Sequence, residues 1–378
     1  MRPILDAHLD LAMNAVYYDR DVTLPLEELN DQEAGLTDQP FRGRATTTLP
    51  ELRRAGVAVC LATLLARSGP KHVRQPSYRR SDLDFGLREG AALSCHAQLA
   101  YYRLLERRGL IRLIRTAAEL DDHWSAYVAA GDRRETVPLG VVLTMEGADP
   151  ILSPDEAGLW WEEGVRAVGI THYGFSHYGA GTGVDGPLTD AGRAILAEFE
   201  RLGMALDVTH LSDTSMAEAL DRFSGPVWAS HHNCRALVPW DRQLTDEQIV
   251  RLAGRDAVIG VACDAVMLSP GWVRGVTRPE VVGLDALADQ IDHIVQRTGG
   301  TRHVGIGTDL DGGYGNEQTP RDLRRYADLR RLEDLLAGRG YGADDLDAIF
   351  FGNWLRKLRE TLPPGVPAAA GAQAEVHA

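Results

Sequence analysis

Short runs of apolar and β-branched residues alternate with longer amphipathic stretches along almost the whole chain. This alternation favours a mainly parallel sheet with helical crossovers, because a parallel connection needs a dozen or more residues and is usually a helix. Nine runs are predicted to form strands, at residues 4–6, 57–62, 110–114, 140–145, 167–171, 205–208, 227–230, 257–263 and 304–307. The helix-like segments between them include residues 93–108, 192–202, 215–222, 246–253 and 284–297.

The length of 378 residues lies within the range of a (β/α)8 barrel, and no break in composition marks a second domain. We therefore predict a single TIM-like (β/α)8 barrel with decorated loops over residues 1–362. Since nine predicted strands compete for eight places, one lies outside the barrel, pairs at an edge or is misread. Residues 67–89 carry two prolines and many charges and are expected to form a long surface loop or insertion. Residues 363–378, rich in Pro, Ala and Gly, are predicted to be a disordered C-terminal tail.

The charge and cysteine content narrow the class of partner and the compartment. The chain has 54 acidic and 40 basic side chains, a formal net charge of −14, and no basic run, which argues against nucleic acid or an anionic membrane as the main partner. No apolar stretch approaches the ~20 residues that span a bilayer, and no leader peptide or membrane anchor is expected. The four cysteines lack CxxC spacing and are expected to be buried or free thiols of a cytoplasmic protein. Whether the chain forms a homodimer is left open.

Polar side chains follow six of the predicted strands at the point where each strand ends. They are His8 with Asp10, Glu146, His172, His210, His231 and Asp309. The carboxyl ends of the strands are where a parallel barrel builds its active site. A single polar residue in such a place is common, since every strand must exit to solvent. Six together, four of them with a histidine from only twelve in the chain, are hard to assign to chance.

These residue types suit metal-assisted hydrolysis. His8 and Asp10 are two residues apart, so on an extended strand their side chains point the same way and can hold one divalent ion. Imidazoles of His210 and His231 would come from two other strands, and the two oxygens of Glu146 can bridge two ions. Nitrogen and oxygen ligands without thiolates favour a catalytic zinc site with open positions over a structural one.

The other histidines carry weaker signals. His232 follows His231, and since neighbouring side chains on a strand face opposite ways, only one of the two can point to the centre. His177 lies in the glycine-rich loop 173–183 and could either line a pocket or lie on the surface. The remaining six are predicted to be surface residues: His72, His96, His123, His293, His303 and His377.

Seven motifs, spread nearly from end to end, carry a resemblance to a known family. The segments are DAHLD at 6–10, MEG at 145–147, GVR at 164–166 with TH at 171–172, GMALDVTH at 203–210, SHHNCRAL at 230–237 with RQLTD at 242–246, GIGTDLDG at 305–312, and GNWLR at 352–356. In order and spacing they resemble the zinc-dependent membrane (renal) dipeptidase family, within the broader metal-dependent amidohydrolase barrels.

The resemblance implies a site with two Zn²⁺ per chain. His8 and Asp10 would hold one ion and His210 and His231 the other, with Glu146 as the bridge. At the ambiguous pair, the resemblance assigns the ligand position to His231.

The resemblance also implies roles in the cleavage of small dipeptides by a hydroxide that the two zinc ions activate. Asp309 matches the catalytic acid/base of the family. His172 matches the residue that contacts the scissile carbonyl oxygen of the substrate. Arg242 matches the residue that contacts its terminal carboxylate, and a guanidinium offers a fork of donors suited to that group.

The chain departs from the family pattern where specificity is expected to be set. Ala7 and Leu9 stand where Gly and Asn are common, Tyr173 stands where a polar residue commonly follows the TH pair, and His232 replaces a small residue. One alternative therefore keeps the metal site but changes the bond to that of an N-acyl amino acid, a lactone or a cyclic amide. A second alternative is a non-catalytic barrel that serves as a binding protein.

Overall fold

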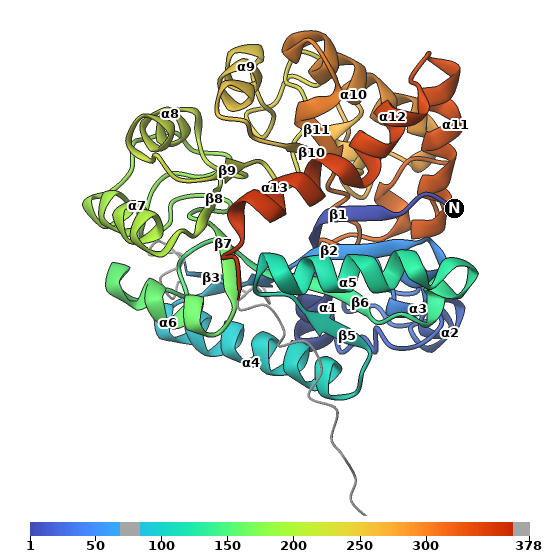
Figure 1. Cartoon of the computed structure of the whole chain (residues 1–378), viewed down its shortest axis with the longest axis horizontal. Helices are drawn as coiled ribbons and strands as arrows, with labels where there is room; N and C mark the ends of the chain where they lie inside the picture. Colours follow the sequence, from blue (N-terminus) through green and yellow to red (C-terminus); the bar gives the residue numbers. More distant parts are fainter. Residues whose placement is uncertain (69–83, 366–378) are drawn as a thin grey trace, which may run out of the picture.

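The computed structural model describes residues 1–68 and 84–365. Its centre is a parallel sheet in the order β10-β11-β1-β2-β6-β7-β8-β9, and an isolated parallel bridge between Ala229 and Ile259 nearly closes the two ends (Figure 1). The eight strands are β1 (Ile4–Leu9), β2 (Val57–Leu65), β6 (Leu139–Glu146), β7 (Val165–Gly169), β8 (Ala205–Asp207), β9 (Val227–Trp228), β10 (Ile259–Val261) and β11 (Val304–Ile306). The predicted TIM-like (β/α)8 barrel is confirmed.

The ninth predicted strand lies outside the barrel and pairs with the amino end of β6. β5 (Ile111–Leu113) lies against the first three residues of β6, from Leu139 to Val141. β7 pairs with the remainder of β6, from Leu143 to Glu146. On the side away from β2, β6 therefore has β5 as its neighbour at the amino end and β7 at the carboxyl end, and β5 takes no place in the barrel.

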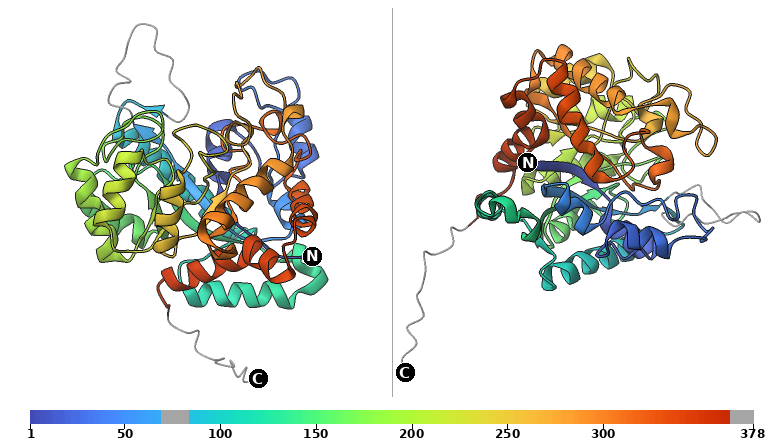
Figure 2. Two further views of the ribbon diagram at one scale, coloured as in Figure 1. Left: turned by 90° about the horizontal axis from the view of Figure 1, so that it is seen from above. Right: turned by 90° about the vertical axis from the view of Figure 1, so that its right-hand side faces the viewer.

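Thirteen α-helices lie in the described ranges 1–68 and 84–365, and most cover the outside of the sheet (Figures 1 and 2). The five helices that the sequence predicts are present with shifts of a few residues, as α4 (Arg88–Arg107), α7 (Asp190–Leu202), α8 (Asp213–Arg222), α9 (Asp246–Gly254) and α10 (Leu284–Thr298). The other helices are α1 (Leu11–Tyr18), α2 (Leu26–Gln32), α3 (Leu49–Arg54), α5 (Ala117–Ala129), α6 (Ala157–Glu162), α11 (Arg331–Gly338), α12 (Ala343–Asp347) and α13 (Asn353–Thr361).

Helix α13 covers the amino ends of the strands together with α5 (Figure 2, left). The amide of Asn353 donates to the carbonyl oxygen of Val304, where β11 begins, at 2.8 Å. The fully buried indole of Trp354 meets that of Trp228 edge to face, with 6.0 Å between the ring centroids. Side chains of α13 and α5 and one face of the strands form a single apolar cluster. This end of the barrel is therefore closed by packed side chains.

His123 on α5 is buried, so the prediction that it is a surface residue is wrong. Its Nε2 donates to the carbonyl oxygen of Ala58 at 2.9 Å, which joins α5 to the start of β2. His96 is exposed and His293 and His303 are half-buried, while His72 and His377 lie outside the described residues.

Two predicted irregular segments are described only in part. The flanks of the expected 67–89 loop pair with each other, as β3 (Arg67–Ser68) and β4 (Asp84–Phe85), and α4 begins at Arg88. Residues 69–83 of that loop and 366–378 of the expected tail lie outside the described residues. Pro363 and Pro364 accept hydrogen bonds from the backbone N–H groups of α5. Among the helices described, none is both long and apolar enough to cross a bilayer.

Candidate metal centre

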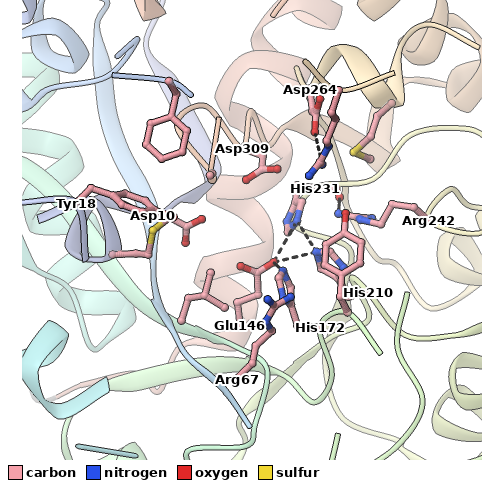
Figure 3. Close-up of a pocket in the computed structure, with 18 of the residues that line it drawn as sticks. Asp10, Tyr18, Arg67, Glu146, His172, His210, His231, Arg242, Asp264 and Asp309 are labelled. Carbon is pink, nitrogen blue, oxygen red and sulfur yellow. Dashed lines mark hydrogen bonds and ion pairs between the residues drawn. The ribbon is translucent and has the colours of Figure 1, made fainter. Parts of the chain in front are cut away.

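The polar residues that follow the predicted strands meet at the carboxyl end of the barrel (Figure 3). His8 lies in β1 and Asp10 directly after it, Glu146 ends β6, and the other four each follow a strand by three residues. All of them except His8 line a cavity of about 560 Å³, within the usual range for small-molecule sites. The cavity-lining members of the set are Asp10, Glu146, His172, His210, His231 and Asp309.

Three donor atoms form a nearly equilateral triangle at this end of the barrel. The Nε2 atoms of His210 and His231 are 3.3 Å apart, and they lie 3.1 Å and 3.3 Å from Oε1 of Glu146. Ligands at 2.0–2.1 Å from one tetrahedral zinc ion would be separated by about 3.3 Å. The triangle therefore fits three ligands of a single ion.

The second oxygen of Glu146 faces a looser group of donors. Nε2 of His8 lies 3.5 Å from Oε2 of Glu146, 3.7 Å from Oδ2 of Asp10 and 3.8 Å from Oδ1 of Asp309. This buried nitrogen has no hydrogen-bond partner among the described residues, which is costly unless it binds something else. A second cation fits the donors, and Glu146 lies where one carboxylate can reach both groups.

Burial and charge set the protonation of these groups. Burial raises the pKa of Asp309 well above its usual range, and the neighbouring carboxylates of Asp10 and Glu146 add to this although His8 opposes it. Burial also acts to raise the pKa of Glu146, but the neighbouring histidines, first of all His8, outweigh it and hold that pKa well below normal. Desolvation lowers the pKa of His172 to about 3, so its ring is neutral at physiological pH. One carboxyl is thus poised to hold a proton beside another that stays ionised.

Hydroxyl side chains form hydrogen bonds with the candidate ligands and orient them. Nδ1 of His210 pairs with Oγ1 of Thr182, and Nδ1 of His231 pairs with Oγ of Ser230, both at 2.9 Å. Thr63 donates from its hydroxyl to Oδ1 of Asp10. Partners of this kind fix the ring orientation of a metal-binding histidine and leave Nε2 free for the ion. Sequence reasoning missed all three hydroxyl residues, and only Ser230 stood inside a noted motif.

The backbone bends sharply where two of these side chains enter the site. His210 has φ +67° and Asp309 has φ +57°, in the left-handed region that non-glycine residues rarely adopt. Such residues cost about 1–3 kcal/mol each and persist only where the surroundings hold them. β8 and β11 each end one residue earlier than predicted, three residues before these left-handed positions.

Two buried aspartates in the recognised motifs tie strands together and do not reach the cavity. Asp6 accepts hydrogen bonds from the N–H and hydroxyl of Thr308 and from the hydroxyl of Tyr326, which joins β1 to the chain after β11. Asp207 accepts from the backbone N–H groups of Thr209 and Ser230 and so joins the ends of β8 and β9. These contacts give a structural reason for both acidic residues.

Arg242 lines the cavity beside the histidines. It is buried, and its Nη2 donates to the carbonyl oxygen of His231 at 2.8 Å. Its Nη1 has no partner within the described part of the chain, which leaves a donor for an anionic group. Two further guanidinium groups line the same cavity, those of Arg67 and Arg274. A wall of Met13, Phe41 and other apolar side chains completes it.

The two ambiguous histidines lie outside the cavity wall. His232 is buried with both ring nitrogens unpaired among the residues described, and its backbone N–H donates to Gly260 at 2.7 Å. His177 is exposed, and its backbone N–H donates to Oδ1 of Asp149. Only His231 of the adjacent pair therefore faces the centre, as expected for neighbours on an extended segment.

Comparison with known proteins places the chain among metallopeptidases. The sequence model of membrane dipeptidase (peptidase family M19) matches residues 2–363. The dipeptidase aclJ of Aspergillus oryzae is 29% identical over 252 residues, which cover 65% of this chain and 56% of that protein. The chain thus spans little more than half the length of this relative.

Two solved structures share the fold over nearly their whole length. A metallopeptidase described as dipeptidase AC of family M19 superposes with a TM-score of 0.75 at 24% identity, covering 96% of this chain and 99% of that one. A metallopeptidase from Rhodobacter sphaeroides, liganded with a phosphinate mimic of the dipeptide L-Ala-D-Ala, superposes with a TM-score of 0.75 at 23% identity, covering 95% and 99%.

Proposed function

The chain belongs to the membrane dipeptidase family, peptidase family M19, and we propose that it is a zinc metallodipeptidase that cleaves small dipeptides. The observation that carries the proposal is the position of Glu146. Its Oε1 completes the triangle with His210 and His231, and its Oε2 faces the group formed by His8 and Asp10. One carboxylate between two sets of nitrogen and oxygen donors is the arrangement that a dinuclear site requires.

We propose that two Zn²⁺ ions occupy these positions, one held by His8 and Asp10 and the other by His210 and His231. When bound, a pair of zinc ions supplies a water of lowered pKa and polarises the carbonyl of the scissile bond. The tight triangle and the unpaired Nε2 of His8 support this assignment.

Asp309 is the proposed proton carrier. Its carboxyl lines the cavity and is partly exposed there. Its raised pKa lets it hold a proton near neutral pH. It would take a proton from the attacking water and give it to the departing amine, which cannot leave as an amide anion.

His172 and Arg242 are the proposed substrate contacts. The neutral ring of His172 can donate a hydrogen bond to the carbonyl oxygen as negative charge develops there. The free Nη1 of Arg242 can bind the terminal carboxylate of a dipeptide, so that its single peptide bond lies beside Glu146. The structural neighbour that binds a mimic of L-Ala-D-Ala supports the proposal that a D-residue is accepted in the second position.

The proposal is tested by metal analysis together with a substrate panel. Protein purified without chelator and reconstituted with zinc should hold about two zinc ions per chain. It should cleave dipeptides, with L,L and L,D forms compared, at a higher kcat/KM than N-acyl amino acids, lactones or cyclic amides. A preference for one of those other bonds would contradict the dipeptidase assignment, and fewer than about one zinc per chain would contradict the metal site.

We also propose that the protein is cytoplasmic. All four cysteines are buried free thiols, which suits a reducing compartment, and fractionation of cells expressing the intact chain tests this.

A further inference from the structure

Four histidines meet at the candidate centre, yet only three of them are assigned to metal. The fourth, His172, lies about as near to Glu146 as His8 does, since its Nε2 is 3.6 Å from Oε1 and Nε2 of His8 is 3.5 Å from Oε2. The ring centroid of His172 is 4.2 Å from that of His210. His172, Glu146 and His210 also form a donor group close enough to hold an ion. Something other than position must therefore separate the hydrogen-bond donor from the ligands.

The difference lies on the outer nitrogen of each ring. Nδ1 of His210 and Nδ1 of His231 each face a hydroxyl oxygen, which can accept a hydrogen bond from Nδ1–H. That tautomer leaves a lone pair on Nε2, the atom that faces Glu146. Both rings are thus prepared to bind a cation through Nε2.

The outer nitrogen of His172 faces Arg67 instead. Nη1 of Arg67 lies 3.2 Å from Nδ1 of His172. A guanidinium has five donors and no acceptor, so Nδ1 must accept and cannot carry a proton. The proton of the ring is then on Nε2, which points a hydrogen-bond donor, and no lone pair, into the cavity.

Arg67 is itself held by contacts outside the catalytic cavity. Its Nε pairs with Oδ1 of Asp84 at 2.7 Å, and its guanidinium is mostly shielded from solvent. The short strands β3 and β4 bring Arg67 and Asp84 side by side, and the backbone N–H of Ser68 donates to Asp149 at 2.9 Å. These contacts aim Nη1 at the imidazole.

We propose that Arg67 is a positioning residue that holds His172 in its Nε2–H tautomer, which keeps His172 out of the metal ligand set and makes it a donor to the substrate carbonyl oxygen. The inference rests on the proposed function, since it assigns the origin of one of its roles. It needs no change in the ionisation of any metal ligand.

The tautomer can be observed directly. Protein labelled with ¹⁵N-histidine gives long-range ¹H–¹⁵N correlation spectra in which the protonated ring nitrogen is identified, and His172→Gln assigns the signal. We expect protonated Nε2 and unprotonated Nδ1 for His172 in the metal-free and zinc-loaded wild type. Protonated Nδ1 in the wild type would overturn the inference without any variant.

Variants of Arg67 then test the cause. Arg67→Met removes the donor at similar length and should shift the His172 signal toward the Nδ1–H form. Arg67→Lys keeps a group that only donates and should retain the wild-type pattern, and Arg67→Gln replaces the Met variant should that fail to fold. Arg274→Met is the matched control, because Arg274 lines the same cavity but pairs with Asp264 at 3.4 Å, and the His172 signal of this variant should not change. An unchanged signal in Arg67→Met would contradict the inference.

Kinetics separate positioning from direct substrate binding. Arg67→Met should lower kcat about 10- to 100-fold, the range seen for residues that orient a functional group, with KM within about threefold of wild type. The affinity for a phosphinate mimic of the tetrahedral state should fall by the same factor as kcat, and no further loss should appear in a His172→Gln background. A rise in KM with unchanged kcat would instead show that Arg67 contacts substrate. If the signal shifts as expected but no dipeptide is cleaved, the proposed function fails and the role of Arg67 in the tautomer stands.

Discussion

The two ends of this barrel differ in what fills them. At the amino end, α13 and α5 cover the strands, Trp354 packs on Trp228, and the buried nitrogen of His123 finds a carbonyl partner. At the carboxyl end, buried donors such as Nε2 of His8 and Nη1 of Arg242 lack partners among the described residues, and the backbone at His210 is strained. The amino end is filled by packed apolar side chains, although the indole nitrogens of Trp228 and Trp354 also lack partners among the described residues. The carboxyl end instead gathers its unpaired polar atoms around a cavity.

The amino end of the barrel therefore contributes mainly to stability, and the carboxyl end carries the candidate site. Packed apolar side chains lower the free energy of the folded state, whereas unpaired donors and left-handed residues raise it. We expect substitutions at the amino end to change the free energy of unfolding with little effect on turnover of the remaining folded protein. Substitutions at the carboxyl end should do the reverse, so that turnover falls with little change in the free energy of unfolding.

The largest expected effect is that of Glu146→Gln. An amide lacks the charge and the two equivalent oxygens with which Glu146 faces both donor groups, so the zinc content should fall and activity should drop to the background level. Metal analysis of dialysed protein and a dipeptide assay measure both quantities. A full complement of zinc would count against bridging by Glu146.

At the opposite end, Trp354→Ala should lower the free energy of unfolding by about 3–5 kcal/mol, because it leaves a cavity beside Trp228. Denaturant unfolding measures the loss. The kcat of the folded fraction at low temperature should stay within about threefold of wild type. A large fall in kcat would show that the two ends are coupled.

Asp309→Asn should leave the zinc content unchanged while kcat falls about 10²-fold or more, the size expected for loss of a general acid/base. The melting temperature should stay at or above that of the wild type, since the substitution removes a buried carboxyl from a crowded site. Near-normal turnover would remove Asp309 from the mechanism.

Arg242→Ala should raise KM for dipeptides with a free carboxylate about 10- to 100-fold, the range of a charge-assisted hydrogen bond, and should affect their C-terminal amides less. Steady-state kinetics on matched pairs of substrates makes this comparison. Equal effects on both members of a pair would rule out the carboxylate contact.

The smallest expected effect concerns pH and His123. Burial lowers the pKa of His123 below the value of about 6.5 that it has in the unfolded chain. The buried neutral ring therefore contributes stability above pH 6.5 that is lost as the pH falls below it, since the unfolded chain then binds the proton. The stability gap between wild type and His123→Gln should therefore shrink between pH 7 and pH 5, as denaturant unfolding at the two pH values would show. A gap that widens on acidification would reverse the sign.

The barrel and the meeting of its polar residues could be predicted because both follow from periodicity. Strands with a dozen or more residues between them have few alternatives to a parallel sheet, and the carboxyl ends of such strands share one edge. The same logic could have found α5, since Thr116 and Glu119 form a capping box that the sequence displays.

The residues that pair with the candidate ligands and with His172 could not be predicted in the same way. Thr63 lies on β2, Arg67 follows on β3, and Thr182 lies in the chain between β7 and α7. A threonine or arginine in a sequence gives no sign of which ring nitrogen or carboxylate it faces, because that depends on contacts between segments far apart in the chain. The burial of His123 was missed for a related reason, because its partner on Ala58 lies 65 residues away.

The left-handed backbone at His210 has an evolutionary consequence. Glycine adopts such a conformation without steric cost, so His210→Gly should yield a metal-free protein at least as resistant to heat as the wild-type apoprotein, although it has lost a candidate ligand. Without selection for catalysis, mutations that replace His210 by glycine would therefore not be opposed by a loss of thermal stability. The imidazole at this position is therefore expected to serve metal binding and not the stability of the apoprotein.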